Sequence, residues 1–202
     1  MLATILREGP RKWCGKLWGM NYYGAKELAD SFRTVRKNTI TIAEQIGEEH
    51  YGFRAAPDTR TVAQMLVHIA VSTKMAEQIQ VVERRKTLEG FDFPAFLAQM
   101  IAAEQTARKK AEIVNLLRTE GEHVARWLEN FPEEALAERV QLPAGVTPPS
   151  KSRFEMLLSI KEHEMHHRGQ LMLIERMIGI VPHTTRQMQE RIAAMQSAKA
   201  SV

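Results

Sequence analysis

Cysteine is almost absent from this chain of 202 residues, in which Cys14 is the single example. One cysteine cannot form a disulfide within the chain, and a chain without disulfides fits a reducing compartment. Residues 20–202 also offer no thiolate as a nucleophile or metal ligand. We therefore expect a cytoplasmic protein whose chemistry does not depend on a thiol of its own.

Long apolar runs and aromatic residues are also scarce. No apolar stretch approaches the roughly 18 residues that a membrane-spanning helix needs, so no membrane association is expected. Aromatic residues make up 6% of the chain, whereas hydrophobic residues as a whole make up 44%. Met, Leu, Ile and Ala supply this apolar mass, and no segment alternates as a strand does. This composition favours helices over strands.

Clustered positive charge is missing as well, although the formal net charge is +4. Residues 1–19 hold four basic side chains and one acidic one. The rest of the chain therefore has 24 basic (28 minus 4) and 23 acidic (24 minus 1) side chains. Nucleic-acid binding needs a concentrated basic surface. We therefore expect no nucleic-acid partner.

Residues 1–19 differ in composition from the rest of the chain. Glycines and a proline interrupt this stretch, and it lacks the apolar core and cleavage site of a secretory signal. Met20 begins an ordinary protein start, so we interpret residues 1–19 as a leader upstream of the true start. The alternative is an N-terminal arm that packs Trp13 and Trp18 on the body. Residues 20–202 are expected to form one domain.

Apolar periodicity and capping residues divide the body into helices. The expected helices cover residues 25–46, 61–85, 95–107, 110–130 and 153–179, and the polar tail from Thr184 leaves one more open. Capping boxes at Thr61–Gln64 and Ser152–Glu155 mark two of the starts. Prolines and glycines between residues 132 and 149 indicate a long surface connection. Four long helices with connections of varied length predict an all-α four-helix bundle.

Two histidines, His163 and His167, are four residues apart on the last long helix. At about 100° per residue, one stripe within roughly 60° of His163 contains Met156, Ile160, His167, Gln170 and Ile174. Charged positions that fall roughly 120–160° away are Lys161, Arg168 and Glu175. The two imidazoles are then about 6 Å apart at their β-carbons and can converge on one ion.

His68 lies on another expected helix and also points inward. It shares a stripe with Thr61, Gln64, Met65, Ser72, Met75, Ile79 and Val82. A single inward histidine is more often a hydrogen-bonded core residue than a ligand. Two neutral imidazoles on one apolar stripe, however, cost roughly 1–3 kcal/mol for each unpaired group. The spacing therefore predicts a divalent metal site built by His68, His163 and His167 on facing helices.

Other polar residues near the stripe are weaker candidates for a role at the metal site. Gln170, one turn beyond His167, is the candidate catalytic residue that contacts bound water or substrate, or else a structural hydrogen-bonding group. His166 is displaced from the stripe and is a doubtful fourth ligand. Glu164 lies beside the stripe, and we predict a solvated carboxylate in preference to a partner of the ligands. The histidines set aside, in connectors or on a solvated face, are His50, His123 and His183.

Two segments resemble the DinB / YfiT-like superfamily. They are LVHIA around His68 and KEHEMHHRGQLMLIERMIGIVPH at residues 161–183, and YGFRAAPDTRTVAQML before His68 adds to the likeness. The spacing HxxxH alone is weak evidence, whereas HxxxHRGQL with an earlier LxHIA is much more specific. The resemblance spans most of Asn21–Arg191.

The resemblance implies a four-helix bundle with up-down-down-up connectivity and a three-histidine site that maps onto His68, His163 and His167. It implies a divalent ion, zinc first, with nickel or iron as alternatives. Characterised relatives include transferases and isomerases that use low-molecular-weight thiols, which implies a small-molecule substrate and such a thiol among the partners. It also implies a homodimer. The family name implies no contact with DNA.

Three functions stay open at this point. The first is a metal-dependent enzyme, either a hydrolase or a thiol transferase, that activates water or a thiol at an open coordination position. The second is a non-enzymatic metal-binding stress-response protein. The third is nucleic-acid binding. A contiguous basic face on the folded protein would favour it. An entry path to the three histidines would favour the first.

Overall fold

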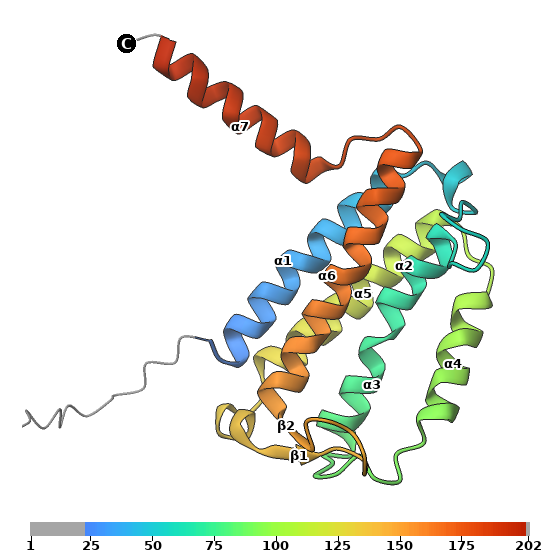
Figure 1. The fold of residues 1–202 in the computed structure, drawn as a ribbon, viewed down its shortest axis with the longest axis vertical. Helices are drawn as coiled ribbons and strands as arrows, with labels where there is room; N and C mark the ends of the chain where they lie inside the picture. The colour runs from blue at the N-terminus through green and yellow to red at the C-terminus, as the bar shows by residue number, and fades with distance from the viewer. Residues whose placement is uncertain (1–22, 201–202) are drawn as a thin grey trace, which may run out of the picture.

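This computed structural model describes residues 23–200, and most of them are helical (Figure 1). The long helices are α1 (Ala25–Gln45), α2 (Val62–Val71), α4 (Phe93–Gln105), α5 (Lys110–Glu129), α6 (Arg153–Met177) and α7 (His183–Ala200). Except for α2, their bounds agree with the expected helices, and α7 lies in the tail where a further helix was left open. The predicted leader, residues 1–19, lies outside the described part of the chain.

The helix expected over residues 61–85 is divided into shorter pieces. Thr61 caps α2 through the predicted box, because its side chain accepts from Gln64 N while the Gln64 side chain accepts from Thr61 N. Ser72 then interrupts α2, and two short pieces come after it, α3 (Thr73–Glu77) and the π-helical η2 (Gln78–Val82).

Two short strands in the connection between α5 and α6 contradict the prediction that the chain contains no strand. β1 (Arg139–Gln141) and β2 (Ser150–Ser152) pair antiparallel, with Val140 opposite Lys151. Val140 is fully buried. Strands of this length are too short for a readable alternation in the sequence. Single 3₁₀ turns, η1 (Glu48–His50) and η3 (Glu133–Ala137), complete the described elements.

The helices α1, α2, α5 and α6 pack side by side, while α7 projects away from them (Figure 1). α1 lies along α5 and α6, and α2 contacts α4, α5 and α6. The interior is apolar over most of its length; its largest fully buried apolar side chains are Phe32, Ile42, Ile46, Leu66, Ile69, Ile113, Leu117, Leu128, Leu157 and Leu171. No described helix is both long and apolar enough to cross a membrane.

A buried ion pair joins four helices across the middle of this interior. Arg36 of α1 donates from Nε to both carboxylate oxygens of Glu164 on α6, over 2.9 and 3.0 Å. Its terminal nitrogens donate to the carbonyls of Leu117 on α5 and Ile69 on α2. Gly121 makes room for this arginine, because a Cβ there would lie 2.7 Å from the Arg36 Cγ.

The buried face of α6 is turned relative to the stripe expected around His163. Glu164 is 2% exposed and Glu175 is fully buried, whereas Gln170 is exposed. The prediction of a solvated Glu164 and of an outward Glu175 is therefore wrong. The physical reason is that α6 packs against α1 as well as α2, so the helix buries a second face. Val82, expected on the inner stripe of His68, is 64% exposed at the end of η2.

Candidate metal centre

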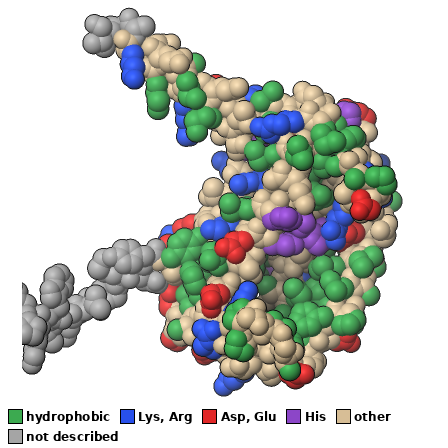
Figure 2. All heavy atoms as spheres, in the orientation of Figure 1, with side chains coloured by type: hydrophobic (Ala, Val, Ile, Leu, Met, Phe, Trp, Pro, Cys, Tyr) green, Lys and Arg blue, Asp and Glu red, His purple; other side chains and the backbone are tan. Residues whose placement is uncertain are grey.

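Three histidines from two helices meet in the middle of the molecule. His68 comes from the last turn of α2, and His163 and His167 come from successive turns of α6. Nε2 of His163 lies 3.2 Å from Nε2 of His68 and 3.1 Å from Nε2 of His167. The candidate ligand atoms of all three lie within 4.8 Å of one another. Figure 2 shows histidine side chains gathered at the centre of one face, beside hydrophobic ones.

The outward ring nitrogens of these histidines have partners of their own. Nδ1 of His68 donates to Glu104 Oε1 over 2.8 Å, and Nδ1 of His167 donates to Gln170 Oε1 over 2.8 Å. Ser72 Oγ lies 3.4 Å from Nδ1 of His163. Because carboxylate and amide oxygens only accept, they assign the protons of His68 and His167 to Nδ1. The Nε2 lone pairs of both rings then point at the same neighbour, His163.

This donor set fits a metal ion. Nε2 of His163 carries at most one proton, so it can donate to only one of the two facing Nε2 atoms. The Nε2 lone pair of the other ring is then left without a hydrogen-bond donor, and a cation that accepts the lone pairs of all three Nε2 atoms would supply its partner. Two ligands at 2.0–2.1 Å from zinc lie about 3.3 Å apart at a tetrahedral angle, close to the observed separations.

Burial keeps these histidines in the form that binds metal. Burial, together with the neighbouring imidazoles of His167 and His68, lowers the pKa of His163 to about 4. Burial also lowers the pKa of His68 and of His167, although hydrogen bonds to Glu104 and Gln170 act in the opposite direction. Neutral imidazole retains a lone pair, so the site is ready for a cation at pH 7.

Glu104 was not among the residues predicted from the sequence. It is 7% exposed, and its carboxylate accepts from Arg60 Nε over 2.7 Å in addition to His68. A signal exists in the sequence, because Glu104 is the only charged residue of α4 and stands one turn after buried Met100. A carboxylate behind a ligating histidine fixes the ring orientation and raises its basicity.

The other residues singled out from the sequence lie around the cluster. Gln170 orients His167, and its Nε2 lies 3.3 Å from Nε2 of exposed His166. His166 stays outside the three-histidine group. His183, predicted to lie in a connector, is buried at the start of α7, with Nε2 3.1 Å from Asn38 Oδ1. The catalytic role of Gln170 stays a prediction.

Two cavities reach the cluster from different sides. One of about 520 Å³ includes His68 and His163 and is lined mainly by apolar side chains of α3, α4 and α6. The other, of about 690 Å³, includes His167 and Glu104 and is more polar, with Arg54 among its lining residues. Concave sites of this size with a few polar groups are typical of small-molecule binding.

Similarity to known proteins agrees with this geometry. A sequence profile of the DinB superfamily matches residues 31–171, which include all three histidines. The uncharacterized protein YjoA of Bacillus subtilis (strain 168) is 24% identical over 155 residues, or 77% of this chain and 91% of YjoA. The crystal structure of the DinB-like YjoA from Bacillus subtilis shares the fold with a TM-score of 0.55 at 20% identity, over 76% and 92% of the two chains. The resemblance seen in LVHIA and HxxxHRGQL is thereby confirmed, and this chain belongs to the DinB superfamily.

Proposed function

We propose that this protein is a metal-dependent enzyme whose divalent ion is held by His68, His163 and His167. The observation that carries the proposal is the convergence of three neutral Nε2 atoms beside cavities of small-molecule size. Zinc is the ion proposed first, with nickel or iron as alternatives, since imidazole suits all of them. A divalent ion with three neutral ligands acts as a Lewis acid and lowers the pKa of a coordinated water or thiol.

The protein's own residues hold the histidines in place. Glu104 and Gln170 keep the Nδ1 protons on His68 and His167 and so direct both Nε2 atoms inward. Gln170 is also exposed in the more polar cavity, within reach of a ligand there, which supports its proposed catalytic role. Residues 23–200 contain no cysteine, so we propose that the nucleophile is an external water or low-molecular-weight thiol.

The proposed reaction class is therefore hydrolysis, or transfer of a low-molecular-weight thiol, on a small-molecule substrate. The alternative is a non-enzymatic metal-binding stress-response protein. The two cavities at the histidines favour the enzyme, because a regulatory or vestigial site has no need of room for a substrate. We propose no nucleic-acid partner for residues 20–202.

Three structural proposals accompany this function: the up-down-down-up bundle, the homodimer and the cytoplasmic location. In Figure 1, α1 and α6 run in one direction while α2 and α5 run in the other, which supports the bundle. The location is supported by the scarcity of cysteine. The homodimer derives from the family resemblance alone, and light scattering that finds only a 23.0 kDa species at micromolar concentration would refute it.

Elemental analysis of the purified protein tests the metal site. We expect about one divalent ion per chain, abolished by His163→Ala and by His167→Ala and weakened or abolished by His68→Ala. His166→Ala is the matched control, because this histidine lies one residue from His167 but is exposed. A full metal content in folded His163→Ala protein would refute the proposed ligand set.

Cobalt substitution separates the two candidate nucleophiles. A thiol that reaches the site should change the absorption spectrum of the cobalt protein when small thiols are titrated in. Water should give a pH-dependent change near neutrality without added thiol. A spectrum that responds to neither would favour the non-enzymatic alternative.

A further inference from the structure

The cavity that includes His68 and His163 has an apolar wall along most of its length. Its volume of about 520 Å³ lies within the range of about 300–1,000 Å³ that is typical of small-molecule sites. Apolar side chains from several different elements form the wall, among them Met75, Ile79, Leu97, Leu142 and Met156. The hydroxyls in the lining already donate to backbone carbonyls; they are those of Ser72, Thr73 and Ser159. A group that needs several hydrogen bonds would therefore lose water along this wall without finding enough partners. The middle of a ligand must therefore be apolar.

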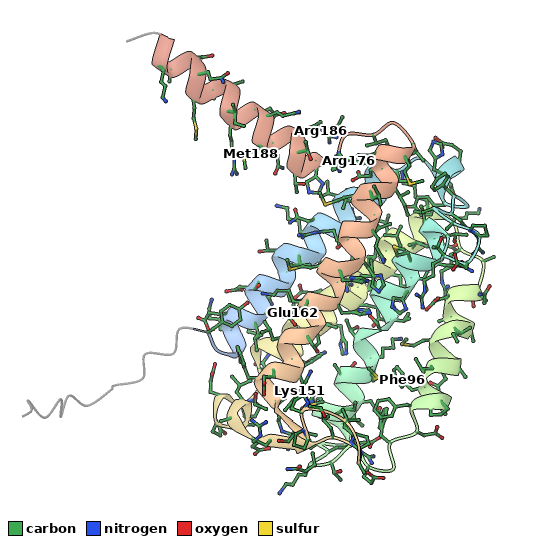
Figure 3. The ribbon with its side chains drawn as sticks, in the orientation of Figure 1. Phe96, Lys151, Glu162, Arg176, Arg186 and Met188 are labelled. Atoms are coloured by element: carbon green, nitrogen blue, oxygen red, sulfur yellow. The ribbon has the colours of Figure 1, made fainter. Side chains whose placement is uncertain are left out.

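The titratable groups of this cavity, Lys151 and the two histidines, lie apart along the direction of α6. His163 lies toward the middle of the helix, while Met156, another lining residue, lies seven positions earlier. Seven residues correspond to about 10 Å of helical rise. Lys151 precedes the helix on β2 and lines the same cavity, and Figure 3 places it beside the N-terminal end of α6. Lys151 and the histidines therefore mark opposite ends of the cavity.

Lys151 is the one Asp, Glu, Lys or Arg side chain among the described residues that line this cavity. It is half-buried, and within residues 23–200 it forms no ion pair. The neighbouring carboxylate of Glu155 is engaged by the backbone N and the Oγ of Ser152. Gln80, also in the wall, already accepts from Arg153 and donates to Met156 Sδ. Lys151 is the cationic group left for a ligand.

We propose that this cavity binds a small anion with an apolar body, its anionic group at Lys151 and its reacting group at the histidines. The inference rests on the proposed function and deepens it, because it names the substrate class of the same site. It also defines the orientation of the substrate in the cavity, because the reacting group lies at the end of the molecule remote from the anionic group. Carboxylate, sulfonate and phosphate monoester groups all accept charge-assisted hydrogen bonds from an ammonium group.

Three probes with the same eight-carbon body and different head groups test this proposal. They are octanoate, octan-1-ol and octylammonium, titrated into the full-length protein by calorimetry. We expect octanoate to bind most tightly and octylammonium most weakly. Lys151→Met should weaken octanoate binding by about fivefold to tenfold, with little change for octan-1-ol. Lys151→Glu should reverse the preference between octanoate and octylammonium.

Two further variants locate the probes. Lys37→Met is the matched control, because it removes the same charge from an exposed position on α1 away from the cavity and should leave octanoate binding unchanged. Ala76→Phe places a ring inside the cavity and should abolish binding of both octanoate and octan-1-ol. Circular dichroism identifies any variant that fails to fold.

Removing metal with a chelator distinguishes failure of this inference from failure of the proposed function. The octanoate preference and its dependence on Lys151 should persist in stripped protein, and equally in protein that never held metal. Octanoate binding that is lost with the metal and unchanged by Lys151→Met would place the carboxylate at the histidines and overturn the proposal. Equal affinity for the three probes, or no binding of any, would overturn it as well.

Discussion

The buried polar groups in the middle of the molecule differ from those at one end of it. The middle layer consists of Arg36, His68, Glu104 and Glu164. Each of these side chains forms hydrogen bonds with another member of the layer, and Arg36 also contacts the backbone. The end layer, at the C-terminal ends of α1 and α6 and the start of α7, consists of Gln45, Glu175 and His183. Each has at least one buried polar atom without a hydrogen-bond partner among the described residues.

This difference indicates that the end layer lowers the stability of the fold, whereas the middle layer does not. A buried polar atom without a partner costs about 1–3 kcal/mol, and more when it is charged. In the middle layer the pairing avoids that cost and also fixes the two helices that carry the histidines. We therefore expect changes in the middle layer to damage stability or metal binding, and a change in the end layer to improve stability.

The largest expected effect is the loss of Arg36. Arg36→Met leaves the Glu164 carboxylate buried without its cation and should lower the free energy of unfolding by about 3–5 kcal/mol. Urea unfolding monitored by circular dichroism measures this. The double variant Arg36→Met/Glu164→Leu should recover most of the loss, because it removes the stranded charge. A double variant no more stable than the single one would show that the pair is not the cause.

The end layer should respond to pH through Glu175. Burial raises the pKa of Glu175 to about 7, well above its ordinary value of 4.5. Between these values folded Glu175 holds its proton while unfolded Glu175 has lost it, so the contribution of Glu175 to the free energy of unfolding falls as pH rises through this window. The expected loss from pH 4.5 to pH 7 and above is up to about 3 kcal/mol.

Comparing the wild type with Glu175→Gln isolates this contribution. The buried histidines titrate in both proteins and cancel in the comparison, so the stability of the variant relative to the wild type should increase from pH 5 to pH 8, and the variant should be the more stable protein at pH 8. Unfolding curves at pH 5 and pH 8, recorded in chelator so that metal binding does not contribute, provide the measurement. Parallel pH dependence in the two proteins would contradict the role assigned to Glu175.

Glu104 links the middle layer to the metal site. Glu104→Gln keeps the size of the side chain but removes the charge behind His68, so metal affinity should fall by about 10- to 100-fold. Competition with a chromogenic chelator measures this affinity. Glu162→Gln is the control, because Glu162 lies beside His163 on the exposed face of α6 (Figure 3) and should leave affinity unchanged. Equal affinities for both variants would exclude a role of Glu104 in orienting His68.

An effect of similar size concerns the space around Arg36. Gly121→Ala places a methyl group 2.7 Å from the Arg36 Cγ and should destabilise the protein by about 1–3 kcal/mol. In an Arg36→Ala background the same substitution should be neutral or stabilising by up to about 1 kcal/mol, because alanine favours a helix over glycine. Equal effects of Gly121→Ala in both backgrounds would mean that the arginine does not explain the glycine.

Helix positions and the three-histidine set were predictable because they depend on local order in the sequence. The boxes at Thr61–Gln64 and Ser152–Glu155 define helix starts through contacts within four residues. His163 and His167 share a helix face through their spacing alone, and His68 was added by its own inward stripe. The strands β1 and β2 were not predictable, because each is three residues long and defined only by its pairing with the other.

The sequence by itself determined most of the helices, the family and the residues that converge, since periodicity, capping and motif spacing are local properties. Only the tertiary structure decided the partners of those residues. Arg36 meets Glu164 across 128 positions of the chain, and His68 meets Glu104 across 36. Helical phase gives the direction of a side chain but not the neighbouring helix. That is why a carboxylate predicted to be solvated is buried, and why the contact of Glu104 with His68 follows only from the packing of α4 against α2.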